Sequence, residues 1–216
     1  MASENQFQAL VLNESDGGIS ASAETITENQ LHAHRPDGNV LVNVRYSSIN
    51  YKDALAVTGE GKVVRSSYPF VPGIDLVGTV LSSDSPDFRP GDVVLQTGWQ
   101  LGEKYWGGYS QRQLLRSDHL LHLPGGLSMR DAMVMGTAGF TAMISIMALE
   151  ANEISTGVGD VLVTGASGGV GSFAVAALAG IGHSKYQPAY SQTGRLAQNA
   201  LYRDRPHEAH QQGQRP

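Results

Sequence analysis

Apolar and polar residues alternate in short runs over residues 1–127, which is the pattern of half-buried β-strands. In the run NVLVNVRYSSIN, Val40, Val42, Val44 and Tyr46 alternate with mostly polar residues. Further candidate strands are bounded by Gly and Pro, and they are FQALVLNE, IDLVGTVL, VVLQTG, GGYSQRQLLR and HLLHLP. Many short strands at close spacing predict a barrel or a sandwich, with one or two short helices.

The pattern changes at Ser128, where a long helix is predicted to begin. Ser128 is the expected N-cap, and Asp131 completes a capping box three residues later. Small and apolar residues then follow at helical spacing to about Ala151. Gly136 and Gly139 would each weaken an isolated helix. Either the backbone approaches a ligand at these glycines or the helix packs tightly there, and the sequence leaves both explanations open.

A short apolar strand (VLVT), a glycine-rich turn and an Ala-rich helix (SFAVAALAGIG) follow one another from Val161 to Gly182. Glycines in this context permit a sharp turn and a close approach of the backbone to a pyrophosphate, whose charge the helix N-terminus then holds. We therefore predict dinucleotide binding by eight consecutive residues, which are Thr164, Gly165, Ala166, Ser167, Gly168, Gly169, Val170 and Gly171. The alternative is a glycine-rich turn inside some other parallel sheet.

Thr164, Gly165, Gly169 and Gly171 also fit Thr-Gly-x-x-x-Gly-x-Gly, a motif that resembles the short-chain dehydrogenases. That family places the motif near its N-terminus and follows it with a catalytic Tyr-x-x-x-Lys. Here roughly 160 residues precede the motif, and no tyrosine has a lysine four positions later. This resemblance is therefore set aside.

Composition and charge narrow the class of protein. The chain has 216 residues, of which 41% are hydrophobic and 16% charged, as in a globular protein. A net charge of −5 gives no electrostatic reason to expect a nucleic-acid or anionic-membrane partner. No apolar run reaches the length of a membrane span and no signal pattern opens the chain, so we expect a cytoplasmic protein. Cysteine is absent and the histidines are scattered, which argues against disulfides and metal sites.

The residues after Gly182 have a different composition. Residues 183–216 carry 5 Lys+Arg against 2 Asp+Glu and lack Val, Ile, Phe, Met and Trp, whereas residues 1–182 carry 10 against 18. Because this tail can bury little apolar surface, we expect it to be disordered and to supply no further strand. The abrupt change suggests a shifted reading frame or a truncated gene.

Four separated segments resemble the medium-chain dehydrogenase/reductase superfamily, and more narrowly its zinc-free acryloyl-CoA reductases and quinone oxidoreductases. The segments are SSINYKDALAVTGEGKVVRSSYPFVPGIDLVGTV, TGWQLGEKYWGGYSQ, MVMGTAGFTAMISIMALE and VLVTGASGGVGS. The likeness extends from Phe7 to Gly182. It implies a GroES-like β-barrel domain at 1–127, the beginning of an incomplete α/β Rossmann domain at 128–182, and an unrelated tail at 183–216.

The resemblance implies an NADPH-dependent, metal-free oxidoreductase that is a cytoplasmic homodimer. Its substrate would be an activated C=C bond, as in acryloyl-CoA or a related enoyl thioester, or a quinone. Zinc-dependent relatives carry a ligand Cys and a Gly-His-Glu segment, where this chain reads Gly73-Ile74-Asp75. Without a metal, hydrogen-bond donors must polarise the acceptor carbonyl, and a proton must reach the α-carbon.

The segment NYKD is the candidate catalytic segment. Asn50 can donate to a carbonyl or to the nicotinamide ribose, and Asp53 can orient a donor or relay a proton. Tyr51 and Lys52 are candidate helpers, Lys52 as a cation near an acyl-CoA phosphate or a cofactor hydroxyl. The alternative is local structure, with Asn50 as an N-cap, Asp53 in the first helical turn and Lys52 solvated. By resemblance, Thr137 lines the nicotinamide pocket.

Two functions follow from these expectations. The first is the reductase, and the second is a catalytically inactive fragment in which only the GroES-like module folds. One strand and one helix cannot form a Rossmann sheet, so we expect the nucleotide half-site to bind NADPH weakly or not at all. Cofactor binding by the purified chain separates the two functions.

Overall fold

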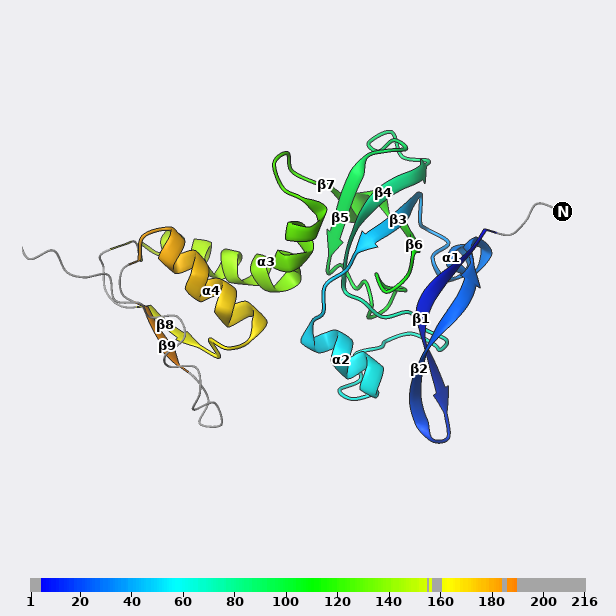
Figure 1. Cartoon of the computed structure of the whole chain (residues 1–216), viewed down its shortest axis with the longest axis horizontal. Helices are drawn as coiled ribbons and strands as arrows, with labels where there is room; N and C mark the ends of the chain where they lie inside the picture. Colours follow the sequence, from blue (N-terminus) through cyan, green and yellow to red (C-terminus); the bar gives the residue numbers. More distant parts are fainter. Residues whose placement is uncertain (1–4, 155, 157–160, 184–185, 190–216) are drawn as a thin grey trace, which may run out of the picture.

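The computed structural model describes residues 5–154, 156, 161–183 and 186–189. A β-rich part lies beside a smaller part, and the long helix α3 (Met129–Ala151) leads from one to the other (Figure 1). In the smaller part, α3 packs against α4 (Gly169–Gly180) beside a short parallel sheet.

An antiparallel five-stranded sheet in the order β6-β3-β4-β5-β7 forms the centre of the β-rich part. Its strands are β3 (Val40–Tyr46), β4 (Asp75–Ser83), β5 (Val93–Thr97), β6 (Arg112–Leu115) and β7 (Leu121–His122). Four of them fall within predicted strand segments, and β4 continues two residues past the end of the segment IDLVGTVL. Alternation along β3 has the expected result at Val40 and Val42, which are fully buried among the core residues of the sheet. It does not hold at Tyr46, which is 47% exposed and follows a register shift between Val44 and Tyr46.

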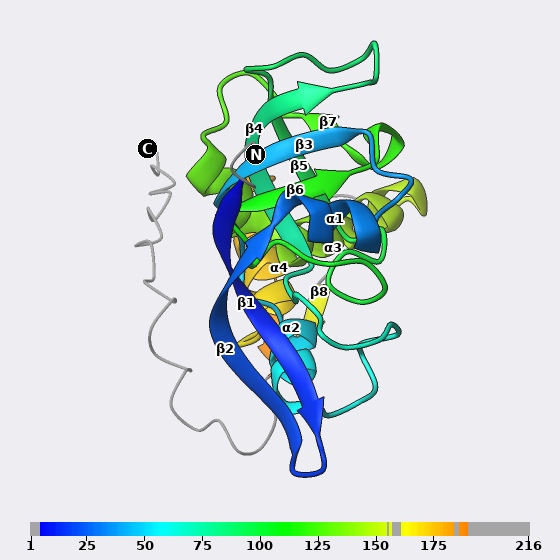
Figure 2. The ribbon, with the colours of Figure 1, turned by 90° about the vertical axis from the view of Figure 1, so that its right-hand side faces the viewer.

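A long antiparallel ribbon of β1 (Gln6–Ser15) and β2 (Gly18–Thr27) lies against this sheet and extends past its end toward α2 (Figure 2). The sequence predicted β1 but not β2. In β2 only Ile26 is buried, so the small and polar residues of this strand show no alternation that could have revealed it.

Two short helices complete the β-rich part, as expected. They are α1 (Glu28–His34) and α2 (Tyr51–Thr58), and a single 3-10 turn, η1, covers Ser117–His119. Helix α1 was not located by sequence, because seven residues with only Leu31 buried are too short for a helical period.

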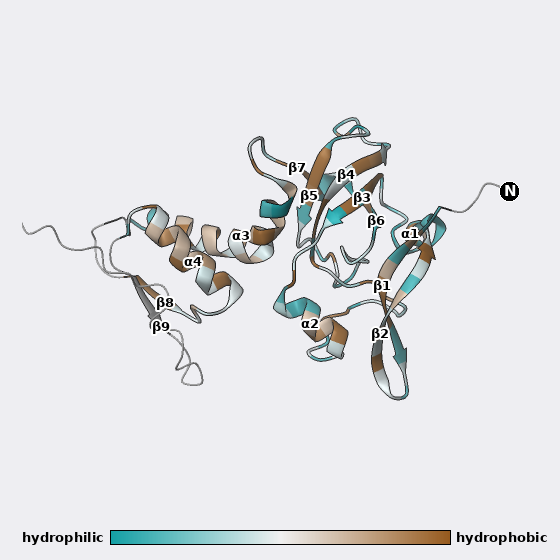
Figure 3. Cartoon of the chain, viewed as in Figure 1, coloured by the Kyte–Doolittle hydropathy of each residue, from teal (hydrophilic) through white to brown (hydrophobic). Residues whose placement is uncertain are grey.

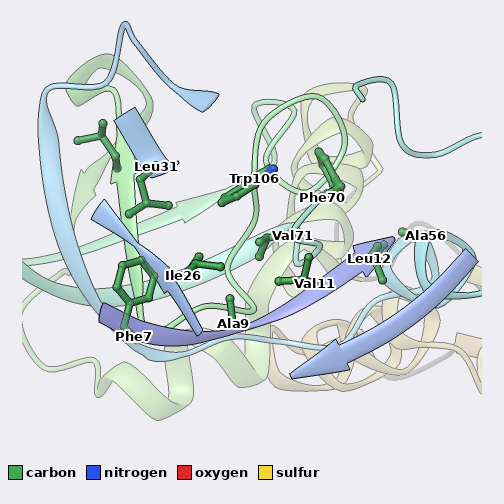
Figure 4. Packing of buried hydrophobic residues seen from close by; sticks show 11 residues of the cluster. Phe7, Ala9, Val11, Leu12, Ile26, Leu31, Ala56, Phe70, Val71 and Trp106 are labelled. Atoms are coloured by element: carbon green, nitrogen blue, oxygen red, sulfur yellow. The ribbon is translucent and has the colours of Figure 1, made fainter. Parts of the chain in front are cut away.

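One hydrophobic cluster joins the ribbon to the helices and to the loop between β5 and β6, which carries Trp99, Tyr105 and Trp106 and is called the aromatic loop below (Figure 4). Its buried members are Phe7, Ala9, Val11, Leu12, Ile26, Leu31, Ala56, Phe70, Val71, Trp106 and Leu114. Trp106 is buried, its indole N–H donates to the Pro69 carbonyl at 3.2 Å, and its ring stacks on His34. Trp99, by contrast, is 62% exposed and stacks on His119. Burial in this cluster therefore explains why the chain has an aromatic residue at position 106, whereas it does not explain the aromatic residue at position 99.

Helix α3 begins as predicted, with Ser128 Oγ accepting the Asp131 backbone N–H at 3.0 Å. Inside the helix the backbone departs from helical geometry at Gly136, with φ 47° and ψ −154°. A positive φ of this kind is open to glycine at little cost. The first turns pack Ala132 and Met133 against Val77 of the sheet.

By length and composition alone, α3 could cross a membrane, since an 18-residue window has a mean hydropathy of 1.8 (Figure 3). The expectation concerned continuous apolar runs, which glycine, threonine and serine residues interrupt in this helix, whereas the average over the window remains apolar. The core helix of a soluble protein passes the same test. The break at Gly136 and the packing of Ala132 and Met133 on the sheet favour a packed helix.

The smaller part contains a complete strand-helix-strand unit, which corrects the prediction that no strand follows Gly182. Strand β8 (Val161–Thr164) leads through the glycine-rich turn into α4, and β9 (Tyr186–Ala189) then pairs in parallel with β8. Sheet pairing uses backbone groups, which every residue carries, so a strand can form in a segment without an apolar signal. The rest of the predicted disordered tail, residues 184–185 and 190–216, lies outside the described residues.

Candidate functional site

The glycine-rich turn joins the end of β8 to the start of α4. Gly165 has a left-handed φ of 61°, and its carbonyl accepts the Gly168 N–H at 2.9 Å. Six of the eight predicted cofactor-binding residues are exposed, while Ala166 and Gly171 are buried. Within the described part of the chain, no side chain caps α4 at Gly168, so its first N–H groups remain available to an anion.

Gly171 allows the helix to approach the turn closely. A Cβ at this position would lie 2.3 Å from the Gly165 carbonyl oxygen and 2.7 Å from the Ala166 Cα. Such an approach of helix to strand is one of the three tasks of glycines in dinucleotide-binding turns. Below the turn, a cavity of about 490 Å³ lies between α3, β8 and α4.

The turn also lies against α3, directly after the helix break. A Cβ at Gly169 would lie 3.2 Å from Ala138 Cβ, and a Cβ at Gly139 would lie 3.6 Å from Phe173. Thr137 is the residue before Ala138, so the fold brings it beside the phosphate-binding turn that the sequence predicted separately.

Asn50 and Asp53 form a capping box at the start of α2, which is the local role that the sequence left open. The Asn50 backbone N–H donates to Asp53 Oδ2 at 2.8 Å. The Asn50 side chain turns to other partners, with Nδ2 donating to Ser48 Oγ at 2.9 Å and to Asp75 Oδ2 at 3.1 Å. Its catalytic role stays a prediction.

Asp53 is 2% exposed, and its Oδ1 accepts the Ile74 N–H at 3.0 Å. Burial raises the pKa of Asp53, although the backbone N–H groups that it accepts act in the opposite direction. Nearby, Tyr109 donates its hydroxyl to the Ser48 carbonyl at 3.0 Å. Burial, followed by the negative charge of Asp53, raises the pKa of Tyr109 far above its ordinary value.

The raised pKa of Asp53 predicts how its charge affects folding. The folded chain binds the Asp53 proton more tightly than the unfolded chain does. Protonation of Asp53 therefore stabilises the fold fully at pH values below its unfolded pKa of 3.8, and this stabilisation is lost as pH rises through the folded pKa. The free energy of unfolding of wild type relative to Asp53→Asn should therefore fall as pH rises from about 4 toward neutrality. Urea titrations of both proteins at a series of pH values measure this difference, and a difference independent of pH would contradict the prediction.

Lys52 and Tyr51, the two candidate helpers, have different environments. Lys52 Nζ lies 2.6 Å from Oε1 of Glu103, whose side chain is only 10% exposed. The Lys52 side chain is 52% exposed, so Lys52 is solvated and ion-paired at once, and contact with a ligand phosphate would compete with this ion pair. Tyr51 is 78% exposed and lies free to reach a ligand. Both roles stay predictions.

Thr137 is hydrogen-bonded to Asp75, a residue to which the sequence analysis gave no role in the site. Its backbone N–H donates to Asp75 Oδ2 at 2.8 Å, and its hydroxyl donates to Asp75 Oδ1 at 2.5 Å. Asp75 is fully buried. The available signal was an acidic residue at the head of the apolar strand IDLVGTVL, where an unpartnered carboxylate would be costly. In the described ranges, no group of three or more His, Cys, Asp or Glu side chains could hold a metal ion.

Comparison with known proteins places these features in a family. Residues 36–125 match the alcohol dehydrogenase GroES-like domain. The chain is 50% identical over 179 residues to the acrylyl-CoA reductase AcuI of Ruegeria pomeroyi, covering 82% of this chain and 53% of that protein. It is 46% identical over 172 residues to YhfP of Bacillus subtilis, which is named as a quinone oxidoreductase, covering 80% and 51%.

Solved structures agree with these relatives. The yhdH oxidoreductase of Salmonella enterica in complex with NADP superposes with a TM-score of 0.79 at 50% identity, covering 87% of this chain and 56% of that one. Bacillus subtilis yhfP with NAD bound gives 0.75 at 40% identity, covering 85% and 60%. The chain thus spans about half the length of the curated relatives that it matches.

The GroES-like match lies over the antiparallel sheet, and the structural likeness extends beyond it into the strand-helix-strand unit. The predicted fold, a GroES-like β-barrel followed by part of a Rossmann domain, is confirmed. Residues 36–125 therefore match the alcohol dehydrogenase GroES-like domain, and over 80% or more of its length the chain is similar to the acrylyl-CoA reductase AcuI and to YhfP.

Proposed function

We propose that this chain carries the substrate-side and part of the cofactor-side machinery of an NADPH-dependent oxidoreductase. The reaction would reduce the activated C=C bond of acryloyl-CoA or a related enoyl thioester, or a quinone. The arrangement that supports this proposal most directly is the contact of the glycine-rich turn with α3 at Ala138, next to Thr137. Cofactor-binding and candidate catalytic residues thereby lie on neighbouring elements.

The residues of the turn suit a dinucleotide. Gly165 adopts the left-handed turn, the α4 N-terminus offers N–H groups, and Gly171 fills the place where a Cβ would collide with backbone. These residues would hold the pyrophosphate, and Thr137 would lie on the nicotinamide side. When bound, a nicotinamide cofactor supplies the hydride. The Salmonella relative was solved with NADP and the Bacillus relative with NAD, so NADPH rather than NADH is part of the proposal.

Within the candidate catalytic segment we propose separate roles for Asn50 and Asp53. Both carboxylate oxygens of Asp53 accept backbone N–H groups, one from Asn50 and one from Ile74. This geometry favours an orienting role for Asp53 over a proton relay, because a relaying oxygen would have to release one of these bonds. Asn50 then presents its side chain from a fixed backbone.

The remaining parts of the proposal concern the whole protein. We keep the domain division at 1–127, 128–182 and 183–216, a cytoplasmic location and a homodimer as proposals. Light scattering of the purified chain measures its oligomeric state. Strand β9 pairs with β8, so the argument that β8 lacks a neighbouring strand no longer supports an inactive fragment. The chain spans only about half of each relative, and the inactive fragment therefore remains the alternative that the next experiment tests.

Cofactor binding is the decisive experiment. The sequence led us to expect weak or no NADPH binding from one strand and one helix, but β8 has a partner in β9. For the proposed reductase, titration of the purified chain with NADPH, followed by the fluorescence of the reduced nicotinamide, should give saturable binding with a micromolar dissociation constant. NADH under the same conditions serves as the comparison, and acryloyl-CoA and a benzoquinone are then tested as oxidants of bound NADPH. Absence of detectable binding by a folded chain would support the alternative in which only the GroES-like module is functional.

A further inference from the structure

A buried carboxylate lies where the sheet meets the break in α3. Asp75 opens β4 and has no exposed surface. Its Oδ2 accepts Ser48 Oγ at 2.5 Å, Asn50 Nδ2 at 3.1 Å and the Thr137 N–H at 2.8 Å. Its Oδ1 accepts the Thr137 hydroxyl at 2.5 Å. Four donors from two distant segments thus converge on one side chain, and the three residues that supply them are half-buried above it.

This convergence fixes the direction of each hydrogen bond. A carboxylate only accepts, so the hydroxyls of Ser48 and Thr137 must spend their single protons on Asp75. The Asn50 amide spends both of its protons, one on Asp75 and one on Ser48 Oγ. The neighbouring carboxylate also settles which end of the amide is nitrogen, since an amide oxygen facing Asp75 would be repelled.

The groups left for a ligand are therefore acceptors. Asn50 Oδ1 has two lone pairs, of which the capping box at Asp53 uses at most one, and Thr137 Oγ1 retains its lone pairs. We propose that Asp75 is a positioning residue that makes this cluster a subsite for a hydrogen-bond donor of the ligand. The donor would be a hydroxyl or a primary amide, such as those of a nicotinamide riboside. In this proposal Asn50 accepts a hydrogen bond from the ligand and does not donate one to a substrate carbonyl. The proposal rests on the proposed function.

The same cluster explains the glycine at the break in α3. A Cβ at Gly136 would lie 2.7 Å from Asp75 Oδ2, and the positive φ turns the chain so that the Thr137 N–H reaches that oxygen. The sequence left ligand approach and tight packing open as explanations. The structure shows tight packing, of backbone against the carboxylate that orients the subsite.

The first test measures the Asn50 amide itself and needs no cofactor. In wild type, the two Asn50 Nδ2 protons should exchange slowly with water in nuclear magnetic resonance spectra, because both are hydrogen-bonded. Asp75→Asn should speed this exchange at least about tenfold, since the new carboxamide brings donors where donors already converge. Ser48→Ala, a milder change at a half-buried residue, should release one of the two protons. Fast exchange of both protons in wild type would overturn the proposal.

The second test measures the ligand donor. Asp75→Asn should weaken NADPH binding about tenfold, the loss expected when a positioned hydrogen bond is no longer made. Asp75→Glu, which keeps the carboxylate, should recover part of this loss. NADPH and its 3-acetylpyridine analogue, in which a methyl group replaces the carboxamide NH2, are compared on wild type and on Asp75→Asn.

The outcomes distinguish the carboxamide from a ribose hydroxyl as the donor, and they distinguish failure of the Asp75 subsite from failure of the proposed function. An analogue that binds wild type more weakly than NADPH identifies the carboxamide as the donor. An analogue that binds equally well, with Asp75→Asn still weakening NADPH, identifies a ribose hydroxyl. NADPH binding unchanged by Asp75→Asn and Ser48→Ala would overturn the subsite. If wild type binds no NADPH, the proposed function fails, and the amide exchange alone then decides whether Asp75 positions Asn50.

Discussion

Gly107→Ala is expected to destabilise the protein by about 3 kcal/mol or more, because no side chain can be placed there without moving backbone. A Cβ at Gly107 would lie 2.3 Å from the Gly73 carbonyl oxygen and 2.4 Å from that of Pro72. The Gly107 N–H donates to the Val71 carbonyl at 2.6 Å, so the two segments are held together and cannot easily separate.

The destabilisation should be large because a second glycine of the aromatic loop, Gly102, also packs against the backbone of Gly73. A Cβ at Gly102 would lie 2.7 Å from the Gly73 carbonyl carbon, so the aromatic loop has no room to shift toward that side. Thermal unfolding should show a melting temperature about 6–12 °C lower than that of wild type. Gly125→Ala is the matched control, since a Cβ at Gly125 has no atom within 4 Å and its backbone is not left-handed. Equal melting temperatures for the two variants would show that the close contact of Gly107 with the backbone of Pro72 and Gly73 does not constrain packing.

Gly171→Ala is expected to weaken NADPH binding about a hundredfold, if the glycine-rich turn holds the pyrophosphate as proposed. The added Cβ would lie 2.3 Å from the Gly165 carbonyl oxygen, which belongs to the turn and not to a flexible side chain. Helix α4 must then move away from the turn, and its first N–H groups move with it. Fluorescence titration with NADPH measures the change in the dissociation constant.

Gly180→Ala is the matched control in the same helix. A Cβ at Gly180 meets no atom within 4 Å, and alanine is the better helix former. Its NADPH affinity should equal that of wild type, with stability unchanged or slightly raised. Equal affinities for wild type and Gly171→Ala would place the cofactor elsewhere, even if the chain binds NADPH.

Local sequence signals predicted much of this protein. The alternation of Val40 and Val42 predicted β3, because a strand with one buried face repeats every second residue. Ser128 and Asp131 predicted the start of α3, because capping is a contact between residues three apart. The glycine-rich turn announced the cofactor-binding unit for the same reason, since strand, turn and helix are adjacent in the chain.

Other features had no local signal. Strand β2 is mostly exposed and polar, so only its pairing with β1 reveals it. Strand β9 lies in a segment with the composition of a disordered tail, and its pairing with β8 uses backbone groups that composition does not describe. The sequence resemblance to reductases ended at Gly182, before this strand.

The sequence by itself therefore determined the β-rich first part, the long helix, the glycine-rich turn and the resemblance to the medium-chain reductases. Only the tertiary structure decided what joins them. Asp75 lies 27 residues from Ser48 and 62 from Thr137 along the chain, and no pattern within a strand or a helix relates such positions. Burying a carboxylate requires donors from wherever the fold can supply them, and folding alone brings those donors to one point.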